Sequence, residues 1–380
     1  MGDGAVLVKS ANLLVAASES SADMLYASGF RAPDAFVFVS IEDHTELLLS
    51  DLEVDRGRRE AKVDEVHSYS EWEKSVQGRK HKKPSQATVL AAFLKARKVK
   101  RVRAPGDFPL GLARELEREG LGLSPVPGSF FPQRERKTAS EVRAVQAALR
   151  ITEAGLARGM EVLQASTIQR DHVLRWRRKI LTAEILRQEM EVAVVRAGGE
   201  ARGDTIVACG EQACDPHERG SGPLRAHQLL ILDIFPRDAC SGYFGDMTRT
   251  VVRGRANAEQ RRLWETCLEG QTMAFKAMKP GASGKTIHQS IKAFFGTSGW
   301  PTKIHEGRWQ GFFHGTGHGL GLEIHENPRF AATEFQTGQI MTVEPGIYMP
   351  GLGGVRHEDV AVITAKGKRV LSSFPKELEI

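Results

Sequence analysis

The first third of the chain alternates short apolar runs with longer runs of helical periodicity. Apolar or alternating runs bounded by turn residues predict strands over residues 13–17, 35–41, 46–49 and 99–103. Apolar residues recur at helical spacing over residues 22–28, 86–98 and 110–119. This alternation predicts an α/β domain with a central sheet over residues 1–130.

A stretch without periodicity follows, and it holds three prolines and a glycine between residues 125 and 132. Such residues interrupt regular structure, so we expect a linker over residues 131–137. Thr138 and Glu141 then form a capping-box pattern in front of a long helical run. A second domain is therefore expected over residues 138–380.

The second domain separates its helical patterns from most of its strand patterns. Helices are predicted over residues 139–165, 170–195, 257–278 and 283–295, and strands over residues 205–209, 229–235, 245–252, 339–343 and 359–364. Helices in one group and mostly hairpin-linked strands in another predict an α+β domain.

Four acidic residues stand at positions where strands should bury them. Asp233 lies inside the apolar run 229–235, and Asp246 precedes a strand that we expect to return antiparallel. Glu344 ends a second apolar run, and Glu358 precedes a third. Each alone is typical of a salt-bridged structural acid. Together they would repel one another strongly, which favours a site that contains cations.

Histidines point to the same chemistry. His314, His318 and His325 fall within twelve residues, and five glycines lie between Gly311 and Gly321. Glycine lets a backbone turn tightly and approach a ligand closely. A lone histidine is more often a core or surface residue than a ligand, but packing does not explain three in this setting.

One imidazole and four carboxylates form a hard, oxygen-rich donor set. Such a set suits Mn²⁺, Co²⁺ or Fe²⁺, with Zn²⁺ compatible and copper disfavoured. Four carboxylates exceed what one ion needs and match two divalent ions. Two ions of this kind lower the pKa of bound water and polarise a carbonyl, so the predicted reaction is hydrolysis.

Five motifs occur in the order LILDIF, GYFGDMTRT, HGTGHGLGLEIHENP, TVEPGIY and GVRHED. As an ordered set they resemble the pita-bread metallopeptidases, specifically the Xaa-Pro branch that comprises proline dipeptidase (prolidase) and aminopeptidase P. The resemblance covers residues 137–380, and the N-terminal region is similar in outline to the creatinase-type domain of these enzymes. It implies a homodimer that uses Mn²⁺ or Co²⁺ and cleaves the bond before proline in proline-containing peptides.

The resemblance also implies roles for individual residues. The implied metal ligands are Asp233, Asp246, His318, Glu344 and Glu358. The implied catalytic or substrate-contacting residues are His217, His314, His325, Tyr348 and Arg356, with Glu344 as the proton shuttle. By the same analogy, a metal-bridging hydroxide attacks the carbonyl before proline, while His217 and His325 stabilise the oxyanion or hold the substrate.

One departure from the family pattern lies beside the first aspartate. Phe235 stands where the family usually has a glycine, and two residues are inserted within 236–241. The insertion makes Asp238 a rival first ligand. Asp233 is preferred because it lies on the apolar strand, whereas Asp238 follows a Pro-Arg turn.

An alternative function comes from a different class of protein. A catalytically inactive pita-bread domain could bind a partner through a basic surface of the N-terminal domain. Such a module has no need for five correct ligand types, so the peptidase is favoured. Substrate length stays open: the thirteen residues between Glu344 and Glu358 are typical of compact prolidases, whereas HGTGHG is equally compatible with aminopeptidase P.

Composition removes other classes of protein. Hydrophobic residues make up 41% and charged residues 26%, as in globular proteins, and no apolar run approaches a membrane-spanning length. The four cysteines form no C-x-x-C pair, which argues against a disulfide framework and a thiolate zinc site. A cytoplasmic enzyme or binding protein is expected.

The net charge of +6 is concentrated in one stretch. Residues 79–103 hold ten Lys or Arg and no acid, so the rest of the chain is net acidic. A basic stripe can bind nucleic acid, but only Phe93 interrupts this one as an aromatic residue, and a base-stacking surface is not favoured. We interpret the stretch as the solvated face of an amphipathic helix.

Overall fold

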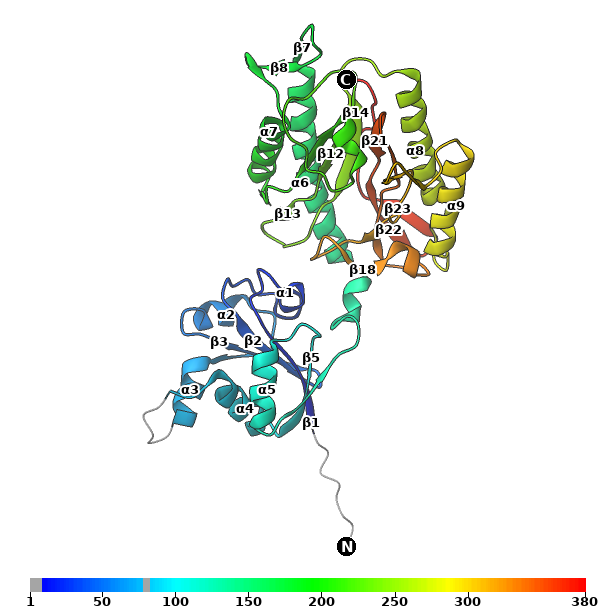
Figure 1. Cartoon of the computed structure of the whole chain (residues 1–380). Coiled ribbons are helices and arrows are strands. Elements are labelled where there is room, and N and C mark those ends of the chain that lie inside the picture. Colours follow the sequence, from blue (N-terminus) through cyan, green and yellow to red (C-terminus); the bar gives the residue numbers. More distant parts are fainter. Residues whose placement is uncertain (1–8, 78–82) are drawn as a thin grey trace. The chain divides into compact units, whose positions relative to one another are not determined.

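A computed structural model describes residues 9–77 and 83–380 of the chain (Figure 1). The chain divides into two compact units, Met1–Pro132 and Gln133–Ile380. The division falls inside the segment 131–137 for which the sequence predicts a linker. Within the described ranges, no helix combines the length and the apolar character needed to span a membrane.

The first unit is built on a mixed sheet with strand order β4–β3–β2–β1–β5–β6. β1 pairs antiparallel with β2 and parallel with β5, whereas β3 and β4 are parallel. Its strands are β1 (Lys9–Ala16), β2 (Phe36–Ile41), β3 (His44–Leu49), β4 (Glu65–Ser68), β5 (Val99–Ala104) and β6 (Gly122–Pro125). Its helices are α1 (Ala22–Ser28), α2 (Val54–Glu60), α3 (Tyr69–Gln77), α4 (Gln86–Ala96) and α5 (Leu110–Arg118). The predicted α/β class is confirmed.

Alternation along the strands gives this sheet two apolar faces. Leu13 and Val37 belong to a core that includes the buried face of α4, whereas Leu14 and Phe38 belong to a core that includes α1. Successive side chains of a strand point to opposite faces, so near-continuous apolar runs are buried on both sides. The sequence analysis assigned no elements to residues 54–77, because charged residues there hide the short helices α2 and α3.

The basic stretch lies partly outside the described residues, which omit 79–82. From Lys83 onward it covers α4 and β5, whose apolar side chains are buried while Lys95 is exposed. Arg97 departs from the expected solvated face. Its Nε donates to Glu46 Oε1 at 2.7 Å, and its guanidinium lies 3.6 Å from the ring centroid of Phe93.

The second unit contains several small sheets and long helices. A three-stranded sheet has the order β11–β12–β14, and a five-stranded sheet has the order β18–β17–β19–β22–β23. The main strands are β11 (Ile206–Cys209), β12 (Leu229–Ile234), β14 (Met247–Val252), β17 (His318–Gly319), β18 (Glu326–Arg329), β19 (Ile340–Val343), β20 (Gly346–Met349), β21 (Gly353–Arg356), β22 (Asp359–Thr364) and β23 (Gly367–Val370). Short strand pairs are β10 (Gly199–Glu200) with β13 (Arg237–Asp238), and β15 (Lys303–His305) with β16 (Arg308–Gln310).

Helix pairs flank these strands on two sides (Figure 1). The helices are α6 (Ala139–Gln164), α7 (Ala183–Arg196), α8 (Ala258–Ala277) and α9 (Gly284–Thr297). One core joins α6 and α7 to β12, and the other joins α8 and α9 to β19. The predicted capping box of Thr138 and Glu141 starts α6. The predicted α+β class is confirmed, and its layered strands bring distant segments of the chain together.

The helix predicted over residues 170–195 is wrong in its first half. Residues before Thr182 form the strands β7 (Thr167–Ile168), β8 (Leu174–Trp176) and β9 (Lys179–Ile180), and α7 begins only at Ala183. Arg177 and Arg178 both have left-handed backbone angles, with φ of 47° and 65°, in the two-residue turn between β8 and β9. A hairpin turn of this kind overrides the helical spacing of the apolar residues.

Candidate functional site

Strand pairing brings the first two acidic residues together. β12 and β14 are antiparallel, as predicted, and Asp233 on β12 stands opposite Thr248 on β14. Asp246 directly precedes β14. Because side chains on neighbouring strands share a face when their residues are paired, Asp233 and Asp246 approach the same side of this sheet.

The five-stranded sheet supplies the other three predicted ligands. His318 begins β17, Glu344 follows β19 and Glu358 precedes β22. β19 and β22 pair antiparallel with Val343 opposite Asp359, so the next position outward places Glu344 beside Glu358. Residues up to 40 positions apart in the sequence thereby meet at one sheet edge.

Glycines allow the chain around His318 to pack against its neighbours. A Cβ atom at Gly317 would lie 2.0 Å from the carbonyl oxygen of Thr342, and one at Gly319 would lie 2.6 Å from that of Asn327. Such distances exclude any side chain at these positions. The predicted role of the glycine-rich segment, close backbone approach, is therefore visible in the packing.

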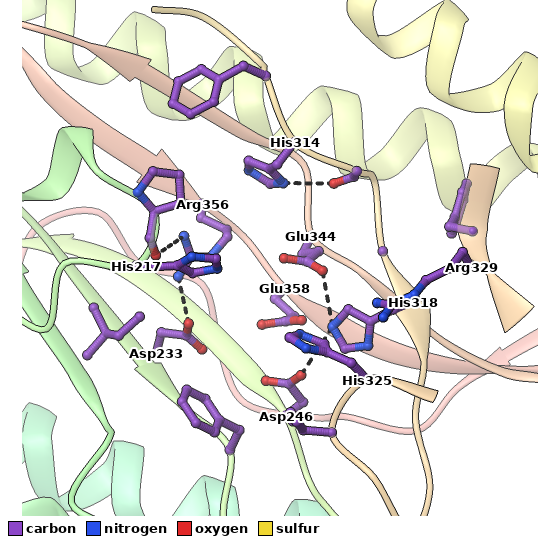
Figure 2. A pocket seen from close by; sticks show the side chains of 18 of the residues that line it. His217, Asp233, Asp246, His314, His318, His325, Arg329, Glu344, Arg356 and Glu358 are labelled. Carbon is purple, nitrogen blue, oxygen red and sulfur yellow. Dashed lines mark hydrogen bonds and ion pairs between the residues drawn. The ribbon is translucent and has the colours of Figure 1, made fainter. Parts of the chain in front are cut away.

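A cavity of about 820 Å³ collects the predicted residues. In Figure 2 the side chains of Asp246, His318, Glu344 and Glu358 converge, with His217, Asp233 and Arg356 to one side and His325 and Arg329 to the other. The predicted residues that line it are His217, Asp233, Asp246, His314, His318, His325, Glu344, Arg356 and Glu358. Tyr348, which the sequence also predicts at the site, does not line the cavity.

The potential ligand atoms lie at spacings that suit metal coordination. Ligand atoms of Asp246, His318 and Glu358 all lie within 4.8 Å of one another. His318 Nε2 is 3.3 Å from Glu344 Oε1 and 3.7 Å from Asp246 Oδ2. Asp233 Oδ1 is buried and has no hydrogen-bond partner among the described residues. A buried carboxylate oxygen without a partner is costly, and a bound cation would satisfy it.

Electrostatics in the cavity also favour cations. Burial raises the pKa of Asp246 and Glu358 well above the ordinary range, and neighbouring carboxylates raise both further. Burial acts in the same direction on Glu344, but the hydrogen bond and charge of His318 lower the pKa of Glu344 to about 2. Clustered carboxylates repel one another, and bound divalent cations stabilise such a cluster. The residues present therefore fit a metal centre.

The tautomer of His318 suits it to bind a metal through Nε2. Its Nδ1 lies 3.1 Å from the carbonyl oxygen of Gly319, and a carbonyl can only accept a hydrogen bond. Nδ1 therefore carries a proton, and in the neutral ring the lone pair of Nε2 faces the acidic residues. A backbone carbonyl that orients a ligating histidine in this way is common at metal sites.

Arg356 joins two sides of the site. Its Nη2 donates to Asp233 Oδ2 at 2.6 Å, and its Nη1 donates to the Tyr348 hydroxyl at 2.9 Å. The Tyr348 hydroxyl in turn lies 2.8 Å from His314 Nε2. Tyr348 is fully buried. Its hydroxyl is held by Arg356 and His314, and its predicted contact with substrate stays a prediction.

The three remaining histidines differ in their surroundings. Burial lowers the pKa of both His314 and His325 to about 4, so both are neutral at pH 7. His314 Nδ1 donates to the carbonyl of Gly315 at 2.8 Å, which leaves Nε2 to accept from Tyr348. The His325 ring packs edge-on against His318, with 4.4 Å between centroids. His217 is exposed and lines the cavity beside Arg356 (Figure 2).

The two rival aspartates occupy different environments. Asp238 lies in β13 and caps its own turn, accepting hydrogen bonds from Cys240 N at 3.0 Å and Ser241 Oγ at 2.6 Å. It does not belong to the cavity wall, which Asp233 does line. The segment 322–324 before His325 forms bends, and β18 begins only at Glu326.

A second group of potential ligands lies in the first unit. His44, Glu46 and Glu65 place ligand atoms within 4.8 Å of one another. Arg97 already donates to both carboxylate oxygens of Glu46, and His67 Nε2 lies 2.7 Å from one of them. This group is therefore an ion-pair network rather than a candidate metal site.

Thr248 and Arg329 are among the residues at the site that the sequence did not single out. Thr248 Oγ1 donates to Glu358 Oε2 at 2.8 Å and accepts from Arg356 Nε at 3.2 Å. Arg329 lines the cavity on the side of His325. Thr248 lies within the motif GDMTRT, so this motif could have identified it as a site residue. Arg329 had no such signal, because an isolated arginine after a proline is common on protein surfaces.

Comparisons with known proteins agree with this geometry. Residues 143–365 match metallopeptidase family M24. The chain is 37% identical over 179 residues to a Xaa-Pro dipeptidase of Pyrococcus furiosus, which covers 46% of this chain and about half, 49%, of that relative. It is 28% identical to a Xaa-Pro dipeptidase of Pyrococcus horikoshii over 74% of this chain and 75% of the relative.

A solved structure extends the likeness to both units. The X-Pro aminopeptidase of Thermotoga maritima shares the fold with a TM-score of 0.81 at 23% identity, over 98% of each chain. Family match, shared two-domain fold and the converging carboxylate and histidine side chains agree with the resemblance carried by the motifs. The chain therefore belongs to metallopeptidase family M24, the pita-bread metallopeptidases.

Proposed function

We propose that this metallopeptidase hydrolyses the peptide bond that precedes proline and uses two divalent metal ions. The observation that carries the proposal is the convergence of five hard ligands and two neighbouring histidines in one cavity. The names of relatives as Xaa-Pro dipeptidases support the choice of substrate. A dipeptide and a longer peptide are both compatible with the cavity.

Five residues would hold the two ions: Asp233, Asp246, His318, Glu344 and Glu358. Their oxygen-rich set favours Mn²⁺ or Co²⁺ and is compatible with Fe²⁺ or Zn²⁺. Ions bound there would lower the pKa of a water molecule and polarise the carbonyl of the substrate. Arg356 would keep Asp233 ionised and oriented, because its guanidinium lies 2.6 Å from that carboxylate.

The chain's other groups act on the proton and the developing charge. Glu344 lines the cavity beside His318, and its carboxylate can accept a proton from the attacking water and pass it to the leaving nitrogen. His217 and His325 line the cavity and can donate hydrogen bonds to the carbonyl oxygen as negative charge develops. The nitrogen of an Xaa-Pro bond is part of the proline ring and carries no N–H. A pocket can therefore select this bond by the fit of the proline ring.

The homodimer and the cytoplasmic location expected from the sequence belong to this proposal. Light scattering of the purified chain and fractionation of cells test them. The alternative, an inactive binding module, is disfavoured because a module without catalysis would not keep five ligands and their hydrogen-bond partners in place.

The test of the proposal uses protein purified without chelator and then supplied with Mn²⁺. We expect two ions per chain and release of proline from Ala-Pro, with no cleavage of Ala-Ala. Comparison with Ala-Pro-Ala determines whether longer peptides are accepted. Metal-loaded protein that leaves Ala-Pro intact, or that cleaves Ala-Ala equally well, would show that the proposed function is wrong.

Thr248 offers a second test, directed at the ligands rather than the reaction. Thr248→Val keeps the shape of the side chain but removes the hydroxyl that donates to Glu358. Loss of a group that orients a ligand typically costs about 10–100-fold in metal affinity. We expect a loss of this size in calorimetric titrations with Mn²⁺. Thr266→Val removes an exposed hydroxyl on α8 and should leave affinity unchanged. Equal affinities in the two variants would contradict the role of Thr248.

A further inference from the structure

Phe235 lines the cavity, yet the proposed mechanism gives it no role. It lies two residues after Asp233, at the end of β12, and side chains two residues apart on a strand point to the same face. The ring therefore projects on the same side as the Asp233 carboxylate. The resemblance implies a glycine at this position, so the ring distinguishes this chain from the family pattern.

The register of the sheet places the neighbours of Phe235. Ile206 and Thr248 stand opposite Asp233 on the two adjacent strands. Beyond the end of β12, Gly245 N donates to the Pro236 carbonyl at 3.0 Å, which continues the pairing before β14 and sets Phe235 opposite Asp246. Asp204 and Asp246 both line the cavity. Ile206 and Ile324 also line it. The wall beside the metal ligands thus combines apolar surface with carboxylates.

Charge indicates which part of a peptide meets this wall. The free amine of a peptide is a cation, and Asp204, which is not one of the proposed metal ligands, lines the same wall as Phe235. The carboxylate of a dipeptide is an anion, and Arg329 lies on the other side of the cavity, beside His325 (Figure 2). Arg219 also lines the cavity, and both arginines are exposed, so solvent screens the charge of each.

We propose that Phe235, together with Ile206 and Ile324, forms an apolar subsite for the side chain of the residue that precedes proline. The inference rests on the proposed function and specifies its substrate class: Xaa-Pro peptides in which Xaa is a large apolar residue. The amine and the side chain belong to the same residue, so anchoring the amine at Asp204 brings the side chain against the Phe235 ring.

The test compares kcat/KM for Leu-Pro and Gly-Pro in metal-loaded protein. We expect the wild-type chain to prefer Leu-Pro and Phe235→Ala to lower the Leu-Pro to Gly-Pro ratio by about 10-fold or more, as apolar contacts in a specificity pocket typically do. Phe235→Leu keeps apolar surface and should restore most of the ratio. Metal content should equal that of the wild type, which separates this effect from damage to Asp233.

Matched controls make each outcome decisive. Phe313→Ala removes another aromatic ring of the cavity, next to His314, and should change the ratio less than twofold. If Phe235→Ala melts below the assay temperature, Phe235→Val serves instead, with a lowered ratio expected. An unchanged ratio overturns the inference. A variant that changes only the preference between Gly-Pro and glycyl-azetidine-2-carboxylate also overturns it, because that result would assign Phe235 to the pocket for the proline ring. Wild-type protein that cleaves neither Leu-Pro nor Gly-Pro overturns the proposed function, and the inference with it.

Discussion

His318→Ala should lose bound metal and lower kcat/KM by more than about 10³-fold, a loss of over about 4 kcal/mol in transition-state stabilisation. His318 Nε2 is the one imidazole atom placed 3.3 Å from Glu344 Oε1 and 3.7 Å from Asp246 Oδ2 in the described cavity. Without it the carboxylates would have to bind the ions alone. Metal analysis of the purified variant and steady-state kinetics check this expectation.

His325→Ala is the matched variant, because its ring packs against His318 at 4.4 Å without facing the acids in the same way. We expect metal content to stay at the wild-type value and kcat to fall by about 10²–10³-fold, the usual cost of losing one hydrogen-bond donor to a developing oxyanion. A purely structural His325 would instead lower the melting temperature and the rate together. Loss of metal from His325→Ala with retention in His318→Ala would reverse the assignment.

Asp233→Asn should also lose metal and most activity, whereas Asp238→Asn should keep both. Asp233 Oδ1 is buried without a partner in the described part of the chain, so it is the oxygen available to an ion. The two oxygens of Asp238 already accept hydrogen bonds from Cys240 and Ser241. Metal stoichiometry and activity of the two variants decide which aspartate is the first ligand.

Stability must be measured alongside metal content for this pair. Asp233→Asn leaves Arg356 without its buried carboxylate partner, and breaking a buried ion pair typically costs about 3–5 kcal/mol. The variant should therefore be assayed well below its melting temperature. A folded Asp233→Asn protein that retains two ions, with metal lost from Asp238→Asn, would move the ligand into the inserted turn.

Much of the catalytic unit could be predicted because its signals are local. Short apolar or alternating runs located β12, β14, β19 and β22, and the capping box located the start of α6. The chemical types of the acidic and histidine residues, together with their order in the motifs, were sufficient to predict a metal site and the peptidase family. These features depend on residues close in sequence, so periodicity and motif spacing are sufficient to predict them.

What the tertiary structure alone decided depends on contacts between distant segments. The hairpin β7–β8–β9 replaced half of a predicted helix because its left-handed turn outweighs apolar spacing. Tyr348 lies behind the cavity wall, where Arg356 and His314 hold its hydroxyl. Thr248 belongs to the site because its hydroxyl donates to Glu358, 110 residues away in sequence. Sequence thus determined which groups are present, whereas the pairing of separate strands determined which of them face the cavity and which are buried behind it.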